Sequence, residues 1–218
     1  MIELGLRNDV YRRPLVTALD RLGLREGWRC ADVGAGGGDV SVALAEVVGR
    51  DGRVYAIDSD PQARDDVAAQ AAGRNAAQVI AITQAAEDLT LPEPVDLAFC
   101  RFLLLHVVDP LHVLKRMAGA IRPGGWLVAQ EAITSAGRVD GRPFQMPDAR
   151  HPDIGALLPA LVRNASANLD VVDAWAEAPA GAGNGPVADY VESLTGVHPG
   201  EDPVVLPPLV TVIARFRG

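Results

Sequence analysis

A run of glycines bounded by two carboxylates is the most chemically informative stretch of this 218-residue sequence. It reads ADVGAGGGD over residues 31–39. Glycines let a backbone turn tightly and approach a ligand closely. A helix that begins directly after such a turn also favours negative charge at its N-terminus. The pattern therefore predicts a ligand-binding turn, and a tight turn without a ligand is the alternative.

The spacing of these glycines separates two kinds of nucleotide-binding turn. The fingerprint of NAD- and FAD-binding folds needs glycine at its first, third and sixth positions. Gly34 and Gly36 satisfy the first two, but the sixth is Asp39, whose carboxylate would face a pyrophosphate. The sequence therefore disfavours a dinucleotide. It fits the pattern Asp-x-Gly-x-Gly-x-Gly, which runs from Asp32 to Gly38.

An aspartate after the next apolar run has a spacing that suits a ribose ligand. Asp58 lies 58 − 38 = 20 residues beyond Gly38. An acidic residue about 20 residues after such a glycine loop binds ribose hydroxyls. The competing interpretation is that Asp58 or Asp60 caps a helix starting at Pro61. Asp60 suits the cap better, which leaves Asp58 for the ribose.

Five stretches carry a resemblance when they are taken together in their order along the chain. They are Asp32–Gly38, Asp58, Ala86–Leu89, Arg101–Pro110 and Arg122–Gly125. With them the chain resembles the class I S-adenosylmethionine-dependent methyltransferases. The spacing is similar to that of the small-molecule branch that includes the ubiquinone/menaquinone biosynthesis methyltransferases. The resemblance covers about residues 27–131.

The resemblance implies how the methionine part of S-adenosylmethionine would be held. Gly34, Ala35 and Gly36 would contact it through their backbone. Asp32 would support its ammonium group.

The resemblance also implies ligands for the nucleoside part. Asp58 would bind the ribose, with Ser59 beside the adenine, and Ala86, Glu87 and Asp88 would lie at the adenine edge. The family often has Asp-Ala before this glutamate, where the present chain has two alanines. Adenine recognition would then fall to the backbone of Ala86 and Glu87, or to Asp88.

Arg101 and His106 are the candidate catalytic residues. Arg101 lies where the methyl group would be presented, and it is also a candidate cofactor ligand. An arginine at the end of an apolar strand is costly unless it is paired, so an ion pair with Glu131 or Asp32 is the alternative. His106 titrates near neutral pH and is a candidate general base, with a structural role as the alternative. His151 is a further candidate for facing the acceptor.

Missing residues argue against three subclasses of the family and against a metal. Metal-dependent O-methyltransferases have a carboxylate at the end of the fourth strand, where this chain has Phe99-Cys100-Arg101. The Asn/Asp-Pro-Pro-aromatic motif of enzymes acting on DNA bases is absent. Arsenic-type transfer needs several thiols, and Cys30 and Cys100 both lie in apolar runs typical of reduced core cysteines.

The elements expected to position these residues alternate regularly over the first 131 residues. Strands are expected over Arg29–Val33, Arg53–Ile57, Gln78–Ile82, Val95–Cys100 and Trp126–Glu131. Helices are expected over Asp9–Leu22, Asp39–Val48, Pro61–Ala72 and Pro110–Ile121, the last ending at residues 122–125. This alternation predicts an α/β fold with a Rossmann-like, doubly wound sheet, because parallel strands need crossover connections.

The rhythm changes after the fifth strand. We expect a long loop over Thr134–Pro152, helices over Asp153–Asn168 and Val187–Leu194, and strands over Leu169–Ala178 and Leu209–Phe216. The resemblance implies a seven-stranded sheet, mostly parallel, with strand 7 antiparallel between the fifth and sixth. The last run is apolar on both sides through Ala214, which suits a strand between two neighbours.

We expect a single methyltransferase domain over residues 1–218. Residues 1–26 would form a helical segment, residues 27–131 the cofactor-binding core, and residues 132–218 the substrate-side loop and C-terminal strands. The acceptor pocket would lie between Tyr11–Arg13, Arg101–His106 and Thr134–Pro152.

The composition of the chain argues against two kinds of partner, nucleic acids and membranes. The net charge of −8 and the absence of a basic block argue against a nucleic-acid substrate. No apolar segment approaches the ~18 residues of a membrane span, and the start has no basic region followed by an apolar one. We therefore expect a cytoplasmic protein without a membrane partner.

The expected function is metal-independent transfer of a methyl group from S-adenosylmethionine to a small-molecule acceptor by in-line displacement, with S-adenosylhomocysteine as product. A catalytically silent S-adenosylmethionine-binding protein, or a partner subunit of the same fold, is the first alternative. An NAD-type Rossmann enzyme is the second. The sequence leaves open the acceptor, the atom that is methylated, the general base and the oligomeric state.

Overall fold

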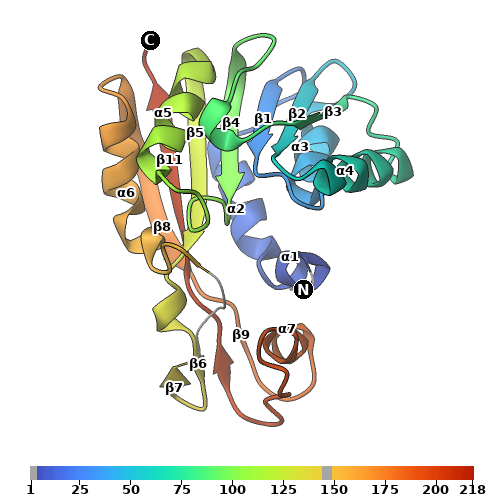
Figure 1. Ribbon diagram of the computed structural model, residues 1–218, viewed down its shortest axis with the longest axis vertical. Coiled ribbons are helices and arrows are strands. Elements are labelled where there is room, and N and C mark those ends of the chain that lie inside the picture. Colours follow the sequence, from blue (N-terminus) through green and yellow to red (C-terminus); the bar gives the residue numbers. More distant parts are fainter. Residues whose placement is uncertain (1–3, 144–148) are drawn as a thin grey trace.

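A seven-stranded sheet forms the centre of the computed structural model, which describes residues 4–143 and 149–218. The strand order is β3-β2-β1-β4-β5-β11-β8 (Figure 1). The parallel strands are β1 (Arg29–Val33), β2 (Arg53–Asp58), β3 (Val79–Thr83), β4 (Val95–Arg101) and β5 (Ile121–Ala132). The last strand in the chain, β11 (Leu209–Phe216), runs antiparallel to both β5 and β8 (Leu169–Glu177).

This topology confirms the predicted fold class and the place of the C-terminal strand. From Leu209 to Ala214 every residue of β11 is buried. Both edges of β11 are paired, and helices cover the sheet, so side chains on either face of the strand enter the core. That burial explains why the sequence shows no polar alternation there.

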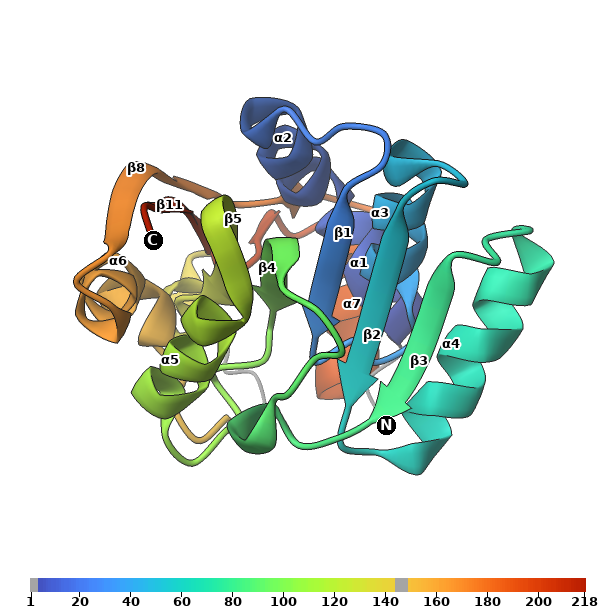
Figure 2. The same ribbon diagram turned by 90° about the horizontal axis from the view of Figure 1, so that it is seen from above.

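Helices cover the sheet on both faces, as Figure 2 shows from above. One face carries α5 (Pro110–Ala120) and α6 (Ile154–Ala165). The other carries α2 (Arg12–Leu22) and α3 (Asp39–Val48), with α4 (Pro61–Gly73) packed beside α3. The predicted crossover helices are therefore all present.

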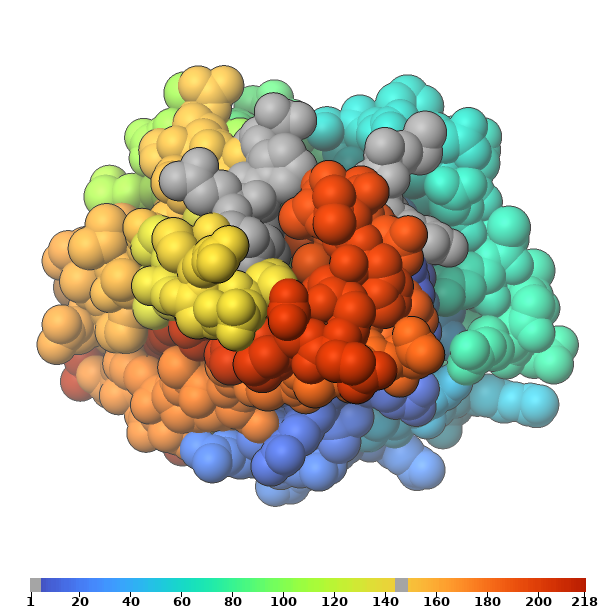
Figure 3. All heavy atoms as spheres, turned by 90° about the horizontal axis from the view of Figure 1, so that it is seen from below, coloured from blue at the N-terminus to red at the C-terminus, as the bar shows by residue number. Residues whose placement is uncertain are grey.

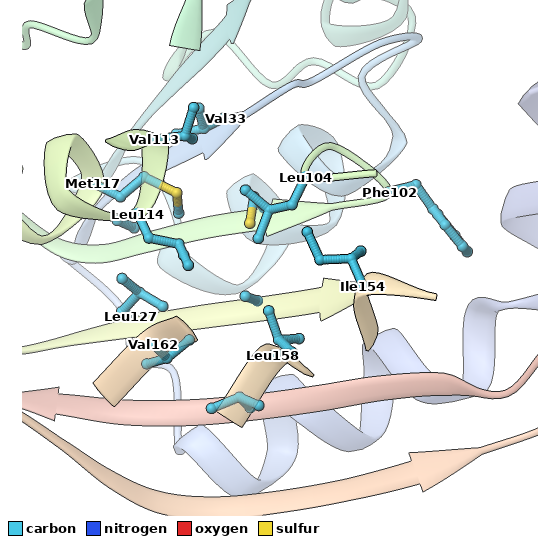
Figure 4. Close-up of a cluster of buried hydrophobic side chains, with 14 of the residues drawn as sticks. Val33, Phe102, Leu104, Val113, Leu114, Met117, Leu127, Ile154, Leu158 and Val162 are labelled. Atoms are coloured by element: carbon cyan, nitrogen blue, oxygen red, sulfur yellow. The ribbon is translucent and has the colours of Figure 1, made fainter. Parts of the chain in front are cut away.

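Aliphatic side chains fill the space between the sheet and the α5–α6 layer. The cluster contains Val113, Leu114, Met117, Leu127, Leu158 and Val162 (Figure 4). All six are fully buried. Phe102 extends beyond the end of β4, away from this cluster, toward the functional region described below (Figure 4).

Carboxylates fix the starts of two helices. Asp60 precedes α4 and accepts a hydrogen bond from the backbone N–H of Gln62 at 2.9 Å. Asp109 does the same for α5, accepting from the N–H of His112 at 3.0 Å. Each acid satisfies one of the backbone donors that a helix start leaves unpaired. The prediction that Asp60 is the cap is confirmed, which leaves Asp58 available for another role.

The N-terminal segment differs from the single helix expected over Asp9–Leu22. It forms α1 (Leu4–Val10) and α2, which are separated at Tyr11. Tyr11 is fully buried, and its hydroxyl donates to the carbonyl of Pro207 at 2.8 Å. Its ring meets that of Phe102 edge-on, with the centroids 5.1 Å apart. The break in the helix lets this large side chain enter the core.

Two further boundaries differ from the predictions. β5 begins at Ile121, whereas residues 122–125 were expected to form the turn after a helix. A Cβ on Gly125 would lie 2.8 Å from the carbonyl oxygen of Asp96, so glycine there lets β5 approach β4 closely. The expected helix over Asp153–Asn168 is α6, which accommodates Pro159 in its interior.

A second, four-stranded sheet was not predicted. Its order is β7-β6-β10-β9, and it lies with α7 (Pro186–Thr195) below the main sheet in Figure 1. The strands are β6 (Arg138–Val139), β7 (Arg142–Pro143), β9 (Ala180–Gly181) and β10 (Val204–Val205). Strands of two residues are too short to show an alternating pattern, so the region was expected to be a loop. Residues 144–148 of that expected loop lie outside the described residues.

The small sheet and α7 define the face at the carboxyl ends of the parallel strands. Seen from below, α7 and the chain after it cover the middle of this face, beside the β6–β7 hairpin in yellow (Figure 3). Among the described residues, no helix is both long and apolar enough to cross a membrane.

Candidate functional site

The glycine loop after β1 adopts a backbone conformation that other residues rarely take. The φ angles are 79° at Gly34, 51° at Gly36 and 88° at Gly38. The N–H groups of Gly34 and Ala35 both donate to the carbonyl of Ile57, at 2.8 and 2.9 Å. The loop is therefore tied to the end of β2, and its three positive φ angles explain the glycines.

Asp58, the last residue of β2, fastens the same loop through its side chain. Its Oδ2 accepts from the N–H of Gly36 at 2.9 Å, and its Oδ1 accepts from the N–H of Asp60 at 3.0 Å. An ionised carboxylate has about four acceptor positions, so two remain for a ligand. The carboxylate is half-buried beside the loop. It can therefore accept from a diol while it holds Gly36.

Five of the ten candidate cofactor ligands line a cavity of about 60 Å³. Its lining includes Gly34, Asp58, Ser59, Ala86 and Glu87. These residues come from the ends of β1 and β2 and from the short helix η1 (Ala86–Asp88) after β3. Asp88 is exposed and does not line the cavity.

Leu103 limits the size of this cavity. It follows β4 and lines the cavity, and its Cδ1 atom lies 2.8 Å from where a Cβ on Gly34 would be. A side chain at position 34 would therefore require Leu103 to shift, and the φ of 79° disfavours one in any case. Ligand pockets usually measure about 300–1,000 Å³. A nucleoside-sized ligand therefore requires the Leu103 side chain to turn aside.

Helix α5 holds η1 in place. His112 Nε2 is 3.0 Å from the carbonyl oxygen of Glu87, and Arg116 donates to the carbonyl of Leu89 at 2.6 Å. Neither residue was singled out from the sequence for this role. Their i, i+4 spacing on one helix face is the signal that pairs them.

Asp32 lies beneath the glycine loop and is nearly inaccessible. It is 2% exposed, and its Oδ2 accepts from the hydroxyl of Ser41 at 2.6 Å. Burial raises the pKa of Asp32 to about 6, although the Ser41 hydrogen bond and Arg101 lower it. A nearby cationic group would favour its charged form.

Arg101 ends β4 and connects the sheet to the N-terminal helices. Its Nη2 donates to Asn8 Oδ1 at 2.5 Å, and its Nη1 to the carbonyl of Tyr11 at 3.4 Å. Burial, followed by the nearby Arg7, lowers the pKa of Arg101 to about 10. Neither of the ion pairs considered from the sequence, with Glu131 or Asp32, is formed. Arg101 instead binds Asn8 of α1 and the backbone of Tyr11, which separates α1 from α2.

Glu131 is a functional candidate that the sequence analysis treated only as a partner for Arg101. It is fully buried at the end of β5, and its Oε1 accepts from the N–H groups of Leu103 and Leu104 at 2.9 and 2.7 Å. Burial raises the pKa of Glu131 to about 7, opposed by these backbone bonds and by Arg7. A charged residue at the end of an apolar strand is the signal that marks it.

Neither of the two histidines considered from the sequence is buried. His106 is exposed and does not line the cavity. His151 is half-buried, and its Nε2 is 3.2 Å from the carbonyl oxygen of Val107. Both cysteines are free and buried, as predicted. Within residues 4–143 and 149–218, no three His, Cys, Asp or Glu side chains gather closely enough to hold a metal ion.

The raised pKa values predict how stability depends on pH. The folded chain holds protons on Asp32 and Glu131 up to about pH 6 and 7, where the unfolded chain has already released them. Stability must then fall as the pH rises through these values. In urea titrations without cofactor, we expect the free energy of unfolding to be on the order of 2 kcal/mol lower at pH 8 than at pH 5.5. Glu131→Gln should reduce this difference, and equal stability of the wild type at both pH values would contradict the prediction.

Comparison with known proteins matches the central part of the chain. Residues 31–129 fit the sequence pattern of a family described as "Methyltransferase domain". The ubiquinone biosynthesis O-methyltransferase of Xanthomonas campestris pv. campestris (strain B100) is 37% identical over 103 residues, which are 46% of this chain and 41% of that protein. The demethylmenaquinone methyltransferase of Geobacillus kaustophilus (strain HTA426) is 32% identical over 126 residues, 57% of this chain and 50% of that protein. The chain thus spans half or less of the length of these curated relatives.

The fold is similar over nearly the whole chain. The crystal structure of a SAM-dependent methyltransferase from Aquifex aeolicus superposes with a TM-score of 0.64 at 18% sequence identity. The superposition covers 93% of this chain and 89% of that one. Together these comparisons confirm the resemblance drawn from the sequence and the predicted architecture.

Proposed function

We propose that this chain, which carries a methyltransferase domain over residues 31–129, transfers a methyl group from S-adenosylmethionine to a small-molecule acceptor. One observation carries the proposal. The glycine loop, Asp58 and η1 converge on one cavity at the carboxyl ends of β1, β2 and β3. Ligands of open parallel sheets bind at this end of the strands.

The residues around the cavity fit the parts of S-adenosylmethionine. We assign the methionine part to the backbone of Gly34, Ala35 and Gly36, whose loop is already held in its turned conformation. The buried carboxylate of Asp32 beneath the loop would support the ammonium group through its negative charge. Asp58 would accept from the ribose hydroxyls with its two remaining acceptor positions.

Fewer residues can bind the adenine edge than the sequence analysis predicted. Ser59, Ala86 and Glu87 line the cavity, whereas the exposed Asp88 does not. We therefore assign the adenine to Ser59, Ala86 and Glu87. Arg101 is assigned a positioning role, because its guanidinium group bonds to α1 and to the α1–α2 break.

The chemistry leaves little for the protein to do beyond positioning. When bound, S-adenosylmethionine supplies a methyl group that its sulfonium has already activated. The chain's own residues then have to orient donor and acceptor in line and exclude water. A base is needed only if the acceptor must lose a proton.

Asp39 supports this function over that of an NAD-type enzyme. It starts α3, and its Oδ1 accepts from Gln70 Nε2 at 2.9 Å, while Asn8 donates to its other oxygen. A fixed carboxylate at this helix N-terminus repels a pyrophosphate. The names of the two curated relatives, a ubiquinone biosynthesis O-methyltransferase and a demethylmenaquinone methyltransferase, support a small-molecule acceptor.

Asp58→Ala is expected to weaken binding of S-adenosylhomocysteine by about 2–3 kcal/mol, the scale of hydrogen bonds to a charged acceptor. The substitution removes the ribose ligand and also releases the N–H of Gly36. Calorimetric titration measures the effect. Asp60→Ala is the matched control, because it removes the cap of α4 but should leave binding unchanged. An Asp58→Ala protein that binds within twofold of wild type would contradict the ribose assignment.

Methyl transfer is expected to need no added metal. β4 ends in Cys100 and Arg101, where metal-dependent O-methyltransferases have a carboxylate. Turnover should therefore be the same with and without EDTA. Activity that EDTA removes and Mg²⁺ restores would overturn this part of the proposal.

A further inference from the structure

Among the described residues, five buried side-chain atoms have no hydrogen-bond partner, and three of them belong to residues that interact with one another. These three are Oε2 of Glu131, the hydroxyl of Tyr190 and Nε of Arg7. They come from three different elements, β5, α7 and α1. A buried polar atom without a partner costs about 1–3 kcal/mol, so such atoms are rare and often functional.

These three side chains form one group, which we call the buried polar cluster. Arg7 interacts electrostatically with both Tyr190 and Glu131. The guanidinium carbon of Arg7 lies 4.7 Å from the ring centroid of Phe102. Helices α1 and α7 pack against each other, and Arg7 belongs to α1 and Tyr190 to α7 (Figure 1).

Phe102, which lies against Arg7 of the buried polar cluster, has a strained backbone. Its φ of 54° is in the left-handed region, which costs about 1–2 kcal/mol for a residue with a side chain. Such strain persists where the surrounding structure holds it and is concentrated at functional sites. Here it turns the chain after β4, so that Phe102 faces Arg7 and Leu103 faces the glycine loop.

Leu103 connects the buried polar cluster to the proposed cofactor cavity. Its N–H donates to Oε1 of Glu131, and its side chain fills the space beside Gly34. Glu131 and the loop assigned to the methionine part are therefore separated by a single residue. An acceptor group bound beside Glu131 would therefore lie next to the assigned methionine part, and in-line transfer needs the reacting atoms about 3–3.5 Å apart.

The hydrogen-bonding capacity of the cluster selects one kind of ligand group. Nε of Arg7 only donates, an ionised Glu131 only accepts, and the Tyr190 hydroxyl does either. A hydroxyl group donates one hydrogen bond and accepts two, so it satisfies all three atoms. A carboxylate has no proton for Glu131 and is repelled by it. An amine has only one lone pair, so it cannot accept from both Arg7 and Tyr190, and the Tyr190 proton would stay without an acceptor.

We propose that Glu131, Tyr190 and Arg7 form the subsite for the nucleophilic group of the acceptor, that this group is a hydroxyl, and that Glu131 takes its proton. The inference rests on the proposed methyltransferase function. The acceptor oxygen forms a bond to the methyl carbon as the carbon–sulfur bond breaks, and that electron pair stays on sulfur. The hydroxyl proton moves to Oε2 of Glu131 and then to solvent. The products are a methyl ether and S-adenosylhomocysteine.

The charge state of Glu131 suits this role. Burial raises its pKa to about 7, against the opposing influence of the N–H groups of Leu103–Leu105 and of Arg7. From β4, the buried thiol of Cys100 faces it and has its own pKa raised partly by this carboxylate. A general base works best when its pKa lies near the working pH.

Glu131→Gln separates the base from a merely structural role. Glutamine keeps an oxygen for the N–H groups of Leu103 and Leu104 but cannot take a proton. We expect kcat to fall at least about 100-fold, the usual scale for a lost general base. The wild-type kcat should rise with pH and level off above about 7, whereas the variant should show no such rise. The affinity for S-adenosylhomocysteine should change less than about threefold.

Binding of small probes tests the hydroxyl preference without turnover. We would titrate the complex with S-adenosylhomocysteine with phenol, aniline and toluene, which share one shape. Phenol should bind at least about tenfold more tightly than the other two, because only phenol satisfies the subsite. Tyr190→Phe and Glu131→Gln should each abolish this preference. Tyr55→Phe and Glu46→Gln are matched controls outside the cluster and should leave it unchanged.

The outcomes separate this inference from the function on which it rests. A wild-type protein that does not bind S-adenosylhomocysteine would contradict the proposed function itself. Binding of S-adenosylhomocysteine without a preference for phenol overturns the subsite alone. So does a Glu131→Gln variant with wild-type kcat and an unchanged pH profile.

Discussion

A chain that ends at Pro208 is expected not to fold. The deletion removes β11, which among the described residues is the only partner of β8 in the sheet and forms the outer neighbour of β5. It also removes side chains that are fully buried, among them Leu209, Val212 and Ala214. The loss of pairing on two strands together with this burial exceeds the ~5–15 kcal/mol by which domains are stable. Circular dichroism and size-exclusion chromatography should show an unfolded or aggregated chain.

A shorter deletion is the control for this result. A chain that ends at Phe216 loses only Arg217 and Gly218, which follow β11. Arg217 makes an exposed ion pair with Asp170, and such pairs contribute at most about 1 kcal/mol. That chain should fold and bind cofactor normally. Val212→Asp in the full chain should reproduce the loss of fold, since it buries a charge in the middle of the sheet. A folded chain that ends at Pro208 and binds cofactor would show that β11 is dispensable.

Gly36→Val is expected to abolish binding of S-adenosylmethionine. Gly36 has a φ of 51°, which a β-branched residue rarely adopts, and its N–H donates to Asp58. Valine would strain the loop, misplace the ribose ligand and occupy the space assigned to the methionine part. Calorimetry should detect no binding at concentrations at which the wild type is saturated.

Gly23→Val separates loss of the site from loss of stability. Gly23 also has a positive φ, 65°, but it ends α2, and a Cβ there would meet nothing within 4 Å. The two substitutions therefore impose similar backbone strain. The Gly23 variant should be destabilised yet bind cofactor like the wild type. If the Gly36 variant folds and binds normally, the glycine loop is only a turn.

The sheet could be predicted from the sequence because its signals are local and long enough to detect. Helices separate the five apolar runs, except between β3 and β4, which a loop with the three-residue helix η1 connects. The antiparallel position of β11 was implied by the family resemblance and agrees with its burial on both faces. The glycine pattern also located the loop whose three positive φ angles the structure contains.

The region proposed to face the acceptor could not be predicted, because its structure depends on contacts between distant segments. Tyr11 breaks the N-terminal helix to reach Pro207 and Phe102, and no local pattern encodes that contact. The two-residue strands of the small sheet are also below the length at which alternation can be recognised.

The proposed general base, Glu131, could not be predicted from the sequence either. His106 was considered as a base from the sequence because of its residue type, with a structural role as the alternative, whereas Glu131 emerges only when burial and hydrogen bonds are known. A raised pKa in a carboxylate comes from its surroundings, and these are not visible in the sequence.

Calorimetric titration of the wild-type protein with S-adenosylhomocysteine and, separately, with NAD⁺ tests the central claim most directly. The claim is that the cavity formed by Gly34, Asp58 and Glu87 binds the methyl donor of a methyltransferase reaction. We expect S-adenosylhomocysteine to bind with one site per chain and NAD⁺ to produce no binding heat. Binding of NAD⁺, or of neither ligand, would contradict the account.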